Sequence, residues 1–217
     1  PLSFSFYMRL CATAPSALVS ALLNGVLFVA SLYLFTSGKL DRDAPRVVKQ
    51  RFVRVALVCT CAPFVMFGMS EVSVLLGSAS CASAASPLQW VGLQAPSAGA
   101  ALLGAVLPCL LTMILFSGPL AMAWVDRDWR TPVWEQIGMH TRGDTRRLLL
   151  ARNLLVGPLA EEWVFRACMC PLLFAAGLSE GINVLSSSLV FGLAHVHHRF
   201  DARAAWLSVV VQLTYTS

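Results

Sequence analysis

The residues best suited to chemistry are two adjacent carboxylates, Glu161 and Glu162, which lie inside a long apolar run. A charge at the centre of a membrane helix costs about 2.5–3.5 kcal/mol on insertion scales, so a function or a partner is expected for each. Glu162 and Arg166 are four residues apart, a spacing that lets them pair on a helix. Glu161 faces about 100° away, on the side of Phe165, and remains available as a general base. The alternative is a structural ion pair with one capping carboxylate.

His195 is the second candidate, because it lies at the depth of Glu161 in a predicted helical hairpin. The hairpin turn centres near residue 179, so both side chains lie roughly 24–27 Å from it along their helices. A carboxylate and an imidazole at one level can share a water molecule. Phe191, four residues before His195, lies on the same face. The alternative for His195 is a hydrogen-bonded histidine at a helix end.

The elements that position these residues are predicted to cross a membrane. The chain is 57% hydrophobic and only 12% charged, with a mean hydropathy of +0.71; soluble domains are about 25% charged. The pattern predicts an all-α, polytopic transmembrane helical bundle with about five spans and the start of a sixth. Pro108 and Pro119 are expected to kink the third span. The spans are residues 16–36, 52–76, 98–125, 148–176 and 182–196, with a sixth from about residue 204.

The charged residues follow an alternating pattern between these spans. The loops at 37–54 and 126–152 are rich in Lys and Arg, and Arg199 and Arg203 mark another basic loop, whereas the loop at 77–98 contains neither residue type. The positive-inside rule places the basic loops in the cytosol and the neutral loop in the lumen. Because the net charge of +5 is concentrated in these loops, it does not indicate nucleic-acid binding.

The cysteines are expected to be small buried hydrophobic residues, since most lie in apolar segments. The pairs Cys59/Cys61 and Cys168/Cys170 lack the C-x-x-C spacing of zinc sites. The seven are Cys11, Cys59, Cys61, Cys81, Cys109, Cys168 and Cys170.

Two other protease classes are disfavoured. A zinc protease is suggested by His195, His197 and His198, but there is no H-E-x-x-H and the three do not share a helical face. A cysteine protease using Cys168 or Cys170 would need a thiolate in an apolar segment, where burial disfavours the charged form.

The two motifs together resemble a known family. Glu161-Glu162-x-x-x-Arg166 followed by Phe191-x-x-x-His195 is similar to the first two motifs of the type II CAAX prenyl endopeptidases, the Ras-converting intramembrane proteases. The flanking residues 157–159, 191–198 and 212–216 resemble the eukaryotic branch. The specific resemblance covers about residues 145–217, and residues 1–144 match only in hydropathy and helix order.

The resemblance implies cleavage after a prenylated cysteine near a substrate's C-terminus, with release of the aaX tripeptide. It implies that Glu161 and His195 activate water, that Glu162, Arg166 and Phe191 support them, and that no metal or cofactor takes part. The implied partners are the lipid bilayer and the C-termini of prenylated CAAX proteins such as small GTPases, with no nucleic acid. The implied location is the endoplasmic reticulum membrane, with several passes and an active site facing the cytosol.

We interpret residues 1–217 as a single membrane-embedded protease domain that is incomplete at its C-terminus. The family's third motif, a His followed four residues later by Asn or Asp, is expected beyond Ser217. Losing one oxyanion donor of this kind typically costs about 10²–10³ in rate, so the 217-residue chain alone is expected to be impaired. The alternatives are a bacterial-type relative that cleaves other peptides, or a non-catalytic membrane fragment or scaffold.

Overall fold

The computed structural model describes residues 7–33, 43–77, 80–94, 97–132, 135 and 143–195. Within these ranges three helices are long and apolar enough to cross a bilayer: α1 (Ala14–Tyr33), α2 (Pro45–Leu75) and α4 (Ala98–Leu115). The predicted all-α, multi-pass membrane bundle is therefore confirmed. A fourth helical path runs through α7 (Gly143–Ala151), η2 (Arg152–Val156), α8 (Gly157–Glu162), η3 (Trp163–Ala167) and α9 (Cys170–Ala175), and α10 (Glu180–Ala194) follows it.

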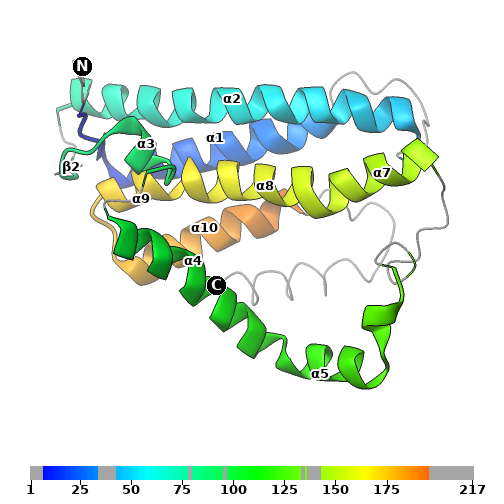
Figure 1. Ribbon diagram of the computed structural model, residues 1–217. Helices are drawn as coiled ribbons and strands as arrows, with labels where there is room; N and C mark the ends of the chain where they lie inside the picture. Colours follow the sequence, from blue (N-terminus) through cyan, green and yellow to red (C-terminus); the bar gives the residue numbers. More distant parts are fainter. Residues whose placement is uncertain are drawn as a thin grey trace, which may run out of the picture.

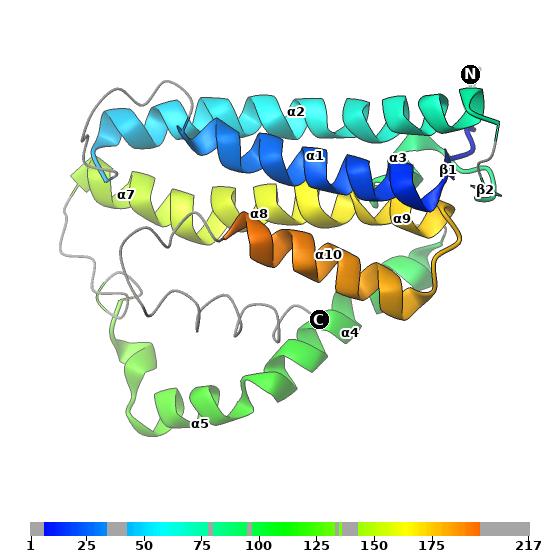
Figure 2. The same cartoon turned by 180° about the vertical axis from the view of Figure 1, so that it is seen from behind.

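α1 is the helix against which the others are arranged. It packs against α2, against η3 and α9 of the fourth path, and against α10, and the long axes of these helices run side by side (Figures 1 and 2). Gly25 allows the close approach, because a Cβ at this position would lie 3.0 Å from Val190 Cγ1 and 3.6 Å from Phe165 Cε1. The core of the bundle lies between these helices, and its largest fully buried side chains include Phe165, Met66 and Met169.

Two wide turns interrupt the fourth path on either side of the carboxylates. Both η2 and η3 are π-helical. The amide of Gly157 donates to Arg152 O, and the amide of Cys168 donates to Trp163 O at 3.0 Å, so each bond spans five residues. Gly157 suits this turn, since a Cβ there would lie 2.8 Å from Arg152 O. Pro158, which has no amide hydrogen, follows at the start of α8. Wide turns of this kind occur frequently at functional sites.

The predicted third span is divided into α4 and α5 (Ser117–Val125), with the break at Phe116. The ring of Pro119 would clash with the carbonyl of Leu115 in a continuous helix, which explains why α4 ends there. Pro108 lies inside α4 without ending it. Apart from Ala100 and Ala123, the residues of α4 and α5 are exposed in the described part of the chain. η1 (Asp128–Arg130) follows α5.

A disulfide joins distant parts of the chain at one end of the bundle. The short strands β1 (Cys11–Ala12) and β2 (Ser80–Cys81) pair antiparallel, with Cys11 opposite Cys81, and these two cysteines are bonded. The expectation that they are simple buried hydrophobic residues was wrong, because strand pairing brings their Cα atoms to 4.0 Å. α3 (Pro87–Trp90) lies at the same end, where Trp90 Nε1 donates a hydrogen bond to Met8 O at 3.2 Å. α7 lies at the opposite end (Figure 1).

Some element boundaries differ from the prediction. Residues 45–54 are the first turns of α2 rather than loop, because Pro45 at the first helical position starts the helix before the apolar stretch. Residues 143–152 are likewise helical. The predicted turn at 177–181 is confirmed in its first half: Gly177 follows α9 with φ of 71°, and Ser179 caps α10. The loop at 197–203 and the sixth span lie outside the described residues.

Candidate active site

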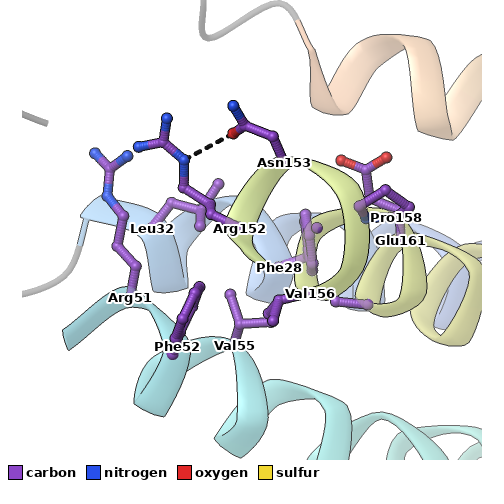
Figure 3. Close-up of a pocket in the computed structure, with 12 residues that line it drawn as sticks. Phe28, Leu32, Arg51, Phe52, Val55, Arg152, Asn153, Val156, Pro158 and Glu161 are labelled. Atoms are coloured by element: carbon purple, nitrogen blue, oxygen red, sulfur yellow. Dashed lines mark hydrogen bonds between the residues drawn. The ribbon is translucent and has the colours of Figure 1, made fainter. Parts of the chain in front are cut away.

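Glu161 and Glu162 end α8 and face two different hollows. Glu161 is half-buried and lines a cavity of about 430 Å³ between α1, α2 and the fourth path. Figure 3 shows its carboxylate at one end of this cavity. The lining is mainly apolar and includes three arginine or asparagine side chains: Phe28, Leu32, Arg51, Phe52, Val55, Arg152, Asn153, Val156, Gly157, Pro158, Ala160 and Glu161. A half-buried carboxylate in such a cavity can act on a water molecule among apolar side chains.

Glu162 lines a second hollow, a groove of about 630 Å³ beneath α3. There it pairs with Arg166, whose Nη1 lies 3.2 Å from Glu162 Oε1. The predicted pairing is therefore present. The pair is less buried than expected, with 62% of the Glu162 side chain and 38% of the Arg166 side chain exposed, because both border the groove. Glu162 is therefore paired with Arg166, and it does not line the cavity that Glu161 lines.

A row of rings holds α1, η3 and α10 in register. Phe165 makes edge-on contacts with Phe28 at 5.3 Å and with Phe191 at 5.1 Å between ring centroids, and Phe191 contacts His195 at 4.6 Å. The Arg166 guanidinium lies 4.7 Å from the centroid of the Phe191 ring, a favourable cation–π distance. Phe191 therefore connects the Glu162–Arg166 pair to His195.

His195 follows the last residue of α10 and is oriented by its own helix. Its Nδ1 lies 2.8 Å from Phe191 O, and because a carbonyl oxygen can only accept, Nδ1 carries the proton of this bond. In the neutral ring the lone pair is then on Nε2. The alternative considered for His195, a hydrogen-bonded histidine at a helix end, describes this contact correctly. The same contact leaves the lone pair of Nε2 available to accept a proton.

The packing of α10 on η3 places Glu161 and His195 at similar levels. Phe165 and Phe191 are in contact across the two antiparallel helices. Glu161 precedes Phe165 by four residues and His195 follows Phe191 by four, so both are displaced by one turn in the same direction. This register agrees with the depth match inferred from the hairpin.

The fourth path is also held against α2. Trp163 Nε1 donates to Cys59 O at 2.7 Å, which fixes η3 directly after the carboxylates. Cys168, considered as a nucleophile, is fully buried in the core, and Cys170 lines the groove beside Arg166. Neither lines the cavity of Glu161.

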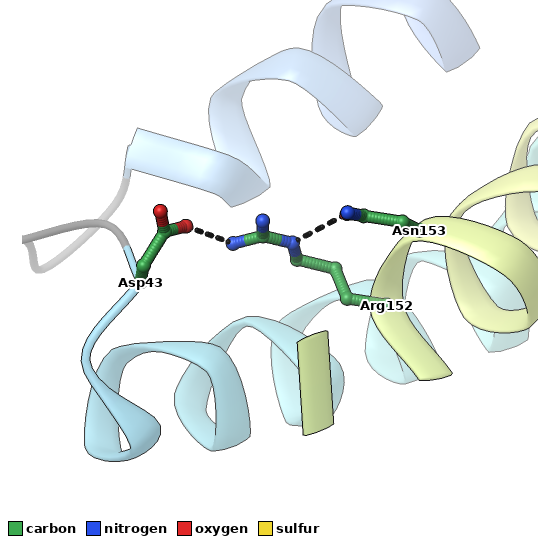
Figure 4. Close-up of polar contacts among 3 residues, drawn as sticks. All are labelled: Asp43, Arg152 and Asn153. Atoms are coloured by element: carbon green, nitrogen blue, oxygen red, sulfur yellow. Dashed lines mark hydrogen bonds and ion pairs between the residues drawn. The ribbon is translucent and has the colours of Figure 1, made fainter. Parts of the chain in front are cut away.

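Sequence reasoning missed the polar groups at the other end of the Glu161 cavity. Arg152 Nη1 lies 2.8 Å from Asp43 Oδ1, and its Nε donates to Asn153 Oδ1 at 2.9 Å (Figure 4). Arg152 is nine residues before Glu161, which in a regular α-helix places the two on opposite sides. The wide turn η2 lies between them, and both line one cavity. A five-residue hydrogen bond leaves no clear trace in the sequence beyond the Gly157-Pro158 pair.

No group of three or more His, Cys, Asp or Glu side chains that could hold a metal ion occurs among the described residues. His197 and His198, the other residues considered as zinc ligands, lie outside the described part of the chain. The structure describes an apolar cavity lined by the Glu161 carboxylate and, outside the lining of this cavity, the oriented imidazole of His195. A carboxylate and an imidazole are suited to acid–base chemistry on water.

Comparisons with known proteins support the resemblance that the motifs predicted. Residues 144–217 match the profile of the type II CAAX prenyl endopeptidase Rce1-like family. The chain is 36% identical over 174 residues to CAAX prenyl protease 2 of Rattus norvegicus, covering 79% of this chain and 53% of the relative. It is 34% identical over 201 residues to CAAX prenyl protease 2 of Homo sapiens, covering 88% and 58%.

A more distant relative is the probable CAAX prenyl protease 2 of Schizosaccharomyces pombe, which is 30% identical over 112 residues, 48% of this chain and 40% of the relative. The chain thus spans about half the length of the curated relatives it matches. No solved structure matches.

Proposed function

We propose that this chain, a relative of the type II CAAX prenyl endopeptidases, is the membrane-embedded part of a metal-independent protease. Its substrates are prenylated CAAX proteins, small GTPases among them, and its reaction is removal of the C-terminal aaX tripeptide. The relatives named CAAX prenyl protease 2 support this substrate class. The observation that carries the chemistry is that Glu161 lines a largely apolar cavity. Helical spacing counted from the Phe165–Phe191 contact supports a position of His195 at a similar level.

In the proposed reaction Glu161 takes a proton from a water molecule, and the water oxygen attacks the carbonyl carbon after the prenylated cysteine. The carbonyl–nitrogen bond then breaks, and the departing amine receives the proton. His195 donates through Nδ1 to Phe191 O, so its Nε2 is the atom that accepts a second proton or orients the water. No step in this sequence requires a metal ion or a cofactor.

Glu162, Arg166 and Phe191 act as positioning residues. Arg166 contacts both Glu162 and the ring of Phe191, and Phe191 contacts His195 and supplies its acceptor carbonyl. Changes in this group alter the placement of His195 relative to Glu161 rather than removing a reacting atom.

We also propose that the enzyme lies in the endoplasmic reticulum membrane with the disulfide end in the lumen. Disulfides persist in oxidising compartments, and α3 and β2 lie in the predicted lumenal loop. The basic first turns of α2 and α7 lie at the opposite end, which the positive-inside rule assigns to the cytosol (Figures 1 and 2). The test is labelling of a single cysteine at position 90 in sealed microsomes with an impermeant reagent. Labelling from the cytosolic side would refute this orientation.

The catalytic assignment is tested with the full-length protein and a farnesylated peptide, by mass spectrometry of the released tripeptide. Glu161→Gln and His195→Ala are expected to lose activity by at least 10²-fold, the lower end for a positioned acid or base. Glu180→Gln, an exposed carboxylate at the start of α10, is the matched control and should retain wild-type activity. Activity of Glu161→Gln within twofold of wild type would contradict the assignment.

Metal independence is tested separately. Activity is expected to survive exhaustive chelation with phenanthroline. Loss of activity that one equivalent of zinc restores would replace this mechanism with a metalloprotease mechanism, in which Glu161 and His195 become ligands.

A further inference from the structure

We propose that Trp163 and Pro63 are positioning residues for Glu161 and that they act together through one hydrogen bond between α2 and the fourth path. Trp163 directly follows the two carboxylates, and its Nε1 donates to Cys59 O of α2 at 2.7 Å. This inference rests on the proposed function and adds two residues to its machinery. The bond sets how closely the segment that carries Glu161 approaches α2.

The acceptor of this bond is available because of the residue one turn after it. In a regular α-helix the carbonyl of Cys59 receives the amide hydrogen of residue 63. Residue 63 is Pro63, which lies inside α2 and has no amide hydrogen. An unsatisfied carbonyl is costly within a membrane, and neighbouring helices supply donors where a proline removes one. The indole of Trp163 supplies that donor, so the proline and the tryptophan form a matched pair on two neighbouring helices.

The segment that carries Glu161 needs a contact outside its own helical path. α8 contains only six residues, and a π-helical turn meets it at each end, η2 before it and η3 after it. Each wide turn interrupts the regular four-residue bonding, so α7 and α9 alone do not set the direction of α8. Trp163 is the first residue of η3. Its bond to α2 therefore fixes α8 at the end that bears the two carboxylates.

Trp163 acts on Glu161 through the backbone. The described residues that line the cavity of Glu161 do not include Trp163, but they include Phe52 and Val55 of α2. The two elements are in contact and run side by side (Figures 1 and 2). A change in their spacing moves the Glu161 carboxylate relative to the α2 wall of the cavity. Small displacements of a reacting group slow the chemical step, so we expect the effect in kcat.

The first test measures kcat and KM of the full-length protein with a farnesylated peptide. Trp163→Phe keeps an aromatic ring and removes the donor. Its kcat per folded enzyme is expected to fall by about 2- to 10-fold, the factor for one neutral hydrogen bond, with KM unchanged. Trp124→Phe, at an exposed tryptophan of α5, is the matched control and should behave as wild type. A kcat loss below twofold would overturn the inference, and so would a rise in KM at unchanged kcat, which would assign Trp163 to substrate binding.

Pro63→Ala separates positioning from general stability. The new amide can donate to Cys59 O within α2 and compete with Trp163, and the substitution also removes an unfavourable proline from a helix interior. We therefore expect kcat to fall while the Tm in detergent does not. Pro108→Ala in the exposed helix α4 is the control and should leave kcat unchanged. An unchanged kcat in Pro63→Ala, or a parallel fall in kcat and Tm as for a purely structural contact, would overturn the inference.

The double variant that combines Pro63→Ala with Trp163→Phe shows whether the two residues act through one bond. Its kcat should equal that of Trp163→Phe, because the bond is already absent there. Multiplied losses would show independent effects and would overturn the inference. An inactive Glu161→Gln beside a fully active Trp163→Phe would refute this inference and leave the proposed function in place. Absence of cleavage by the wild type would refute the proposed function and this inference with it.

Discussion

Breaking the Cys11–Cys81 disulfide is expected to destabilise the bundle without touching the cavity of Glu161. The bond joins residues 70 positions apart, and together with the β1–β2 pairing it ties the start of α1 to the segment after α2. Additional contacts converge there: the amide of Cys11 donates to Ser70 Oγ at 2.8 Å, and Ser80 Oγ donates to Ala175 O at 2.6 Å. The disulfide therefore supports α1, α2 and α9 at one end.

The magnitude follows from the length of the closed loop. For a 70-residue separation, the chain-entropy treatment gives about 4.4 kcal/mol at 25 °C. This value is an upper bound, because α1 and α2 remain helical in a bilayer even when the bundle comes apart. We therefore expect about 1–3 kcal/mol, which corresponds to a decrease in Tm of about 2–12 °C for a chain of this size.

The assay is thermal unfolding of the purified protein in detergent, with and without reductant, together with a gel-shift count of reactive thiols. The variant Cys11→Ser should unfold at the lower temperature under both conditions, and reductant should not lower it further. Cys109→Ser, an exposed and unpaired cysteine of α4, is the control and should behave as wild type. An unchanged thiol count after reduction of denatured wild type would show that the bond does not form. An unchanged Tm in Cys11→Ser would refute the reasoning about its contribution.

Three further predictions concern packing and polar contacts, each measured as unfolding in detergent. Gly25→Val should destabilise the protein by about 1–3 kcal/mol through overpacking against Val190. Gly68→Ala is the control and should be neutral, because nothing lies within 4 Å of the new Cβ. Equal effects of the two substitutions would contradict this packing. Arg166→Ala should lower the free energy of unfolding by about 1–2 kcal/mol, which is more than for Glu162→Ala, because it removes the cation–π contact with the Phe191 ring as well as the ion pair. A larger effect of Glu162→Ala would argue against the ring contact. Asn24→Leu should stabilise by about 1–3 kcal/mol, because its amide is fully buried and has no hydrogen-bond partner in the described structure; a loss of stability would indicate a bound water.

Helical spacing alone was sufficient to predict much of the bundle and part of the site. The apolar lengths predicted the spans now seen as α1 and α2, and the i,i+4 spacing predicted the Glu162–Arg166 pair. The level of His195 followed from counting residues across one turn. Each of these depends on local geometry that repeats regularly, which is why a sequence is sufficient to infer it.

Features that depend on contacts between distant segments were not predictable in this way. The pairing of Cys11 with Cys81 follows from two short strands 70 residues apart, and neither strand has a periodicity of its own. Arg152 lines the cavity of Glu161 because the wide turn η2 lies between the two residues. Regular helical spacing does not predict this turn, so Arg152 was predicted only as part of a basic loop that sets the membrane topology.

The wide turn η2 makes the number of residues before Glu161, as well as their identity, part of the site. Deleting one residue from 153–156 would convert its five-residue bond into an ordinary four-residue bond. Arg152 would then precede Glu161 by eight residues of regular α-helix, which turn by two full turns and about 80°, so the two residues would still lie on one side of the helix. Deleting residue 159 or 160 would instead leave the wide turn in place and rotate Arg152 and α7 by about 100° relative to Glu161. Deletions within the wide turn are therefore expected to be less damaging than deletions in α8, although both segments belong to one helical path.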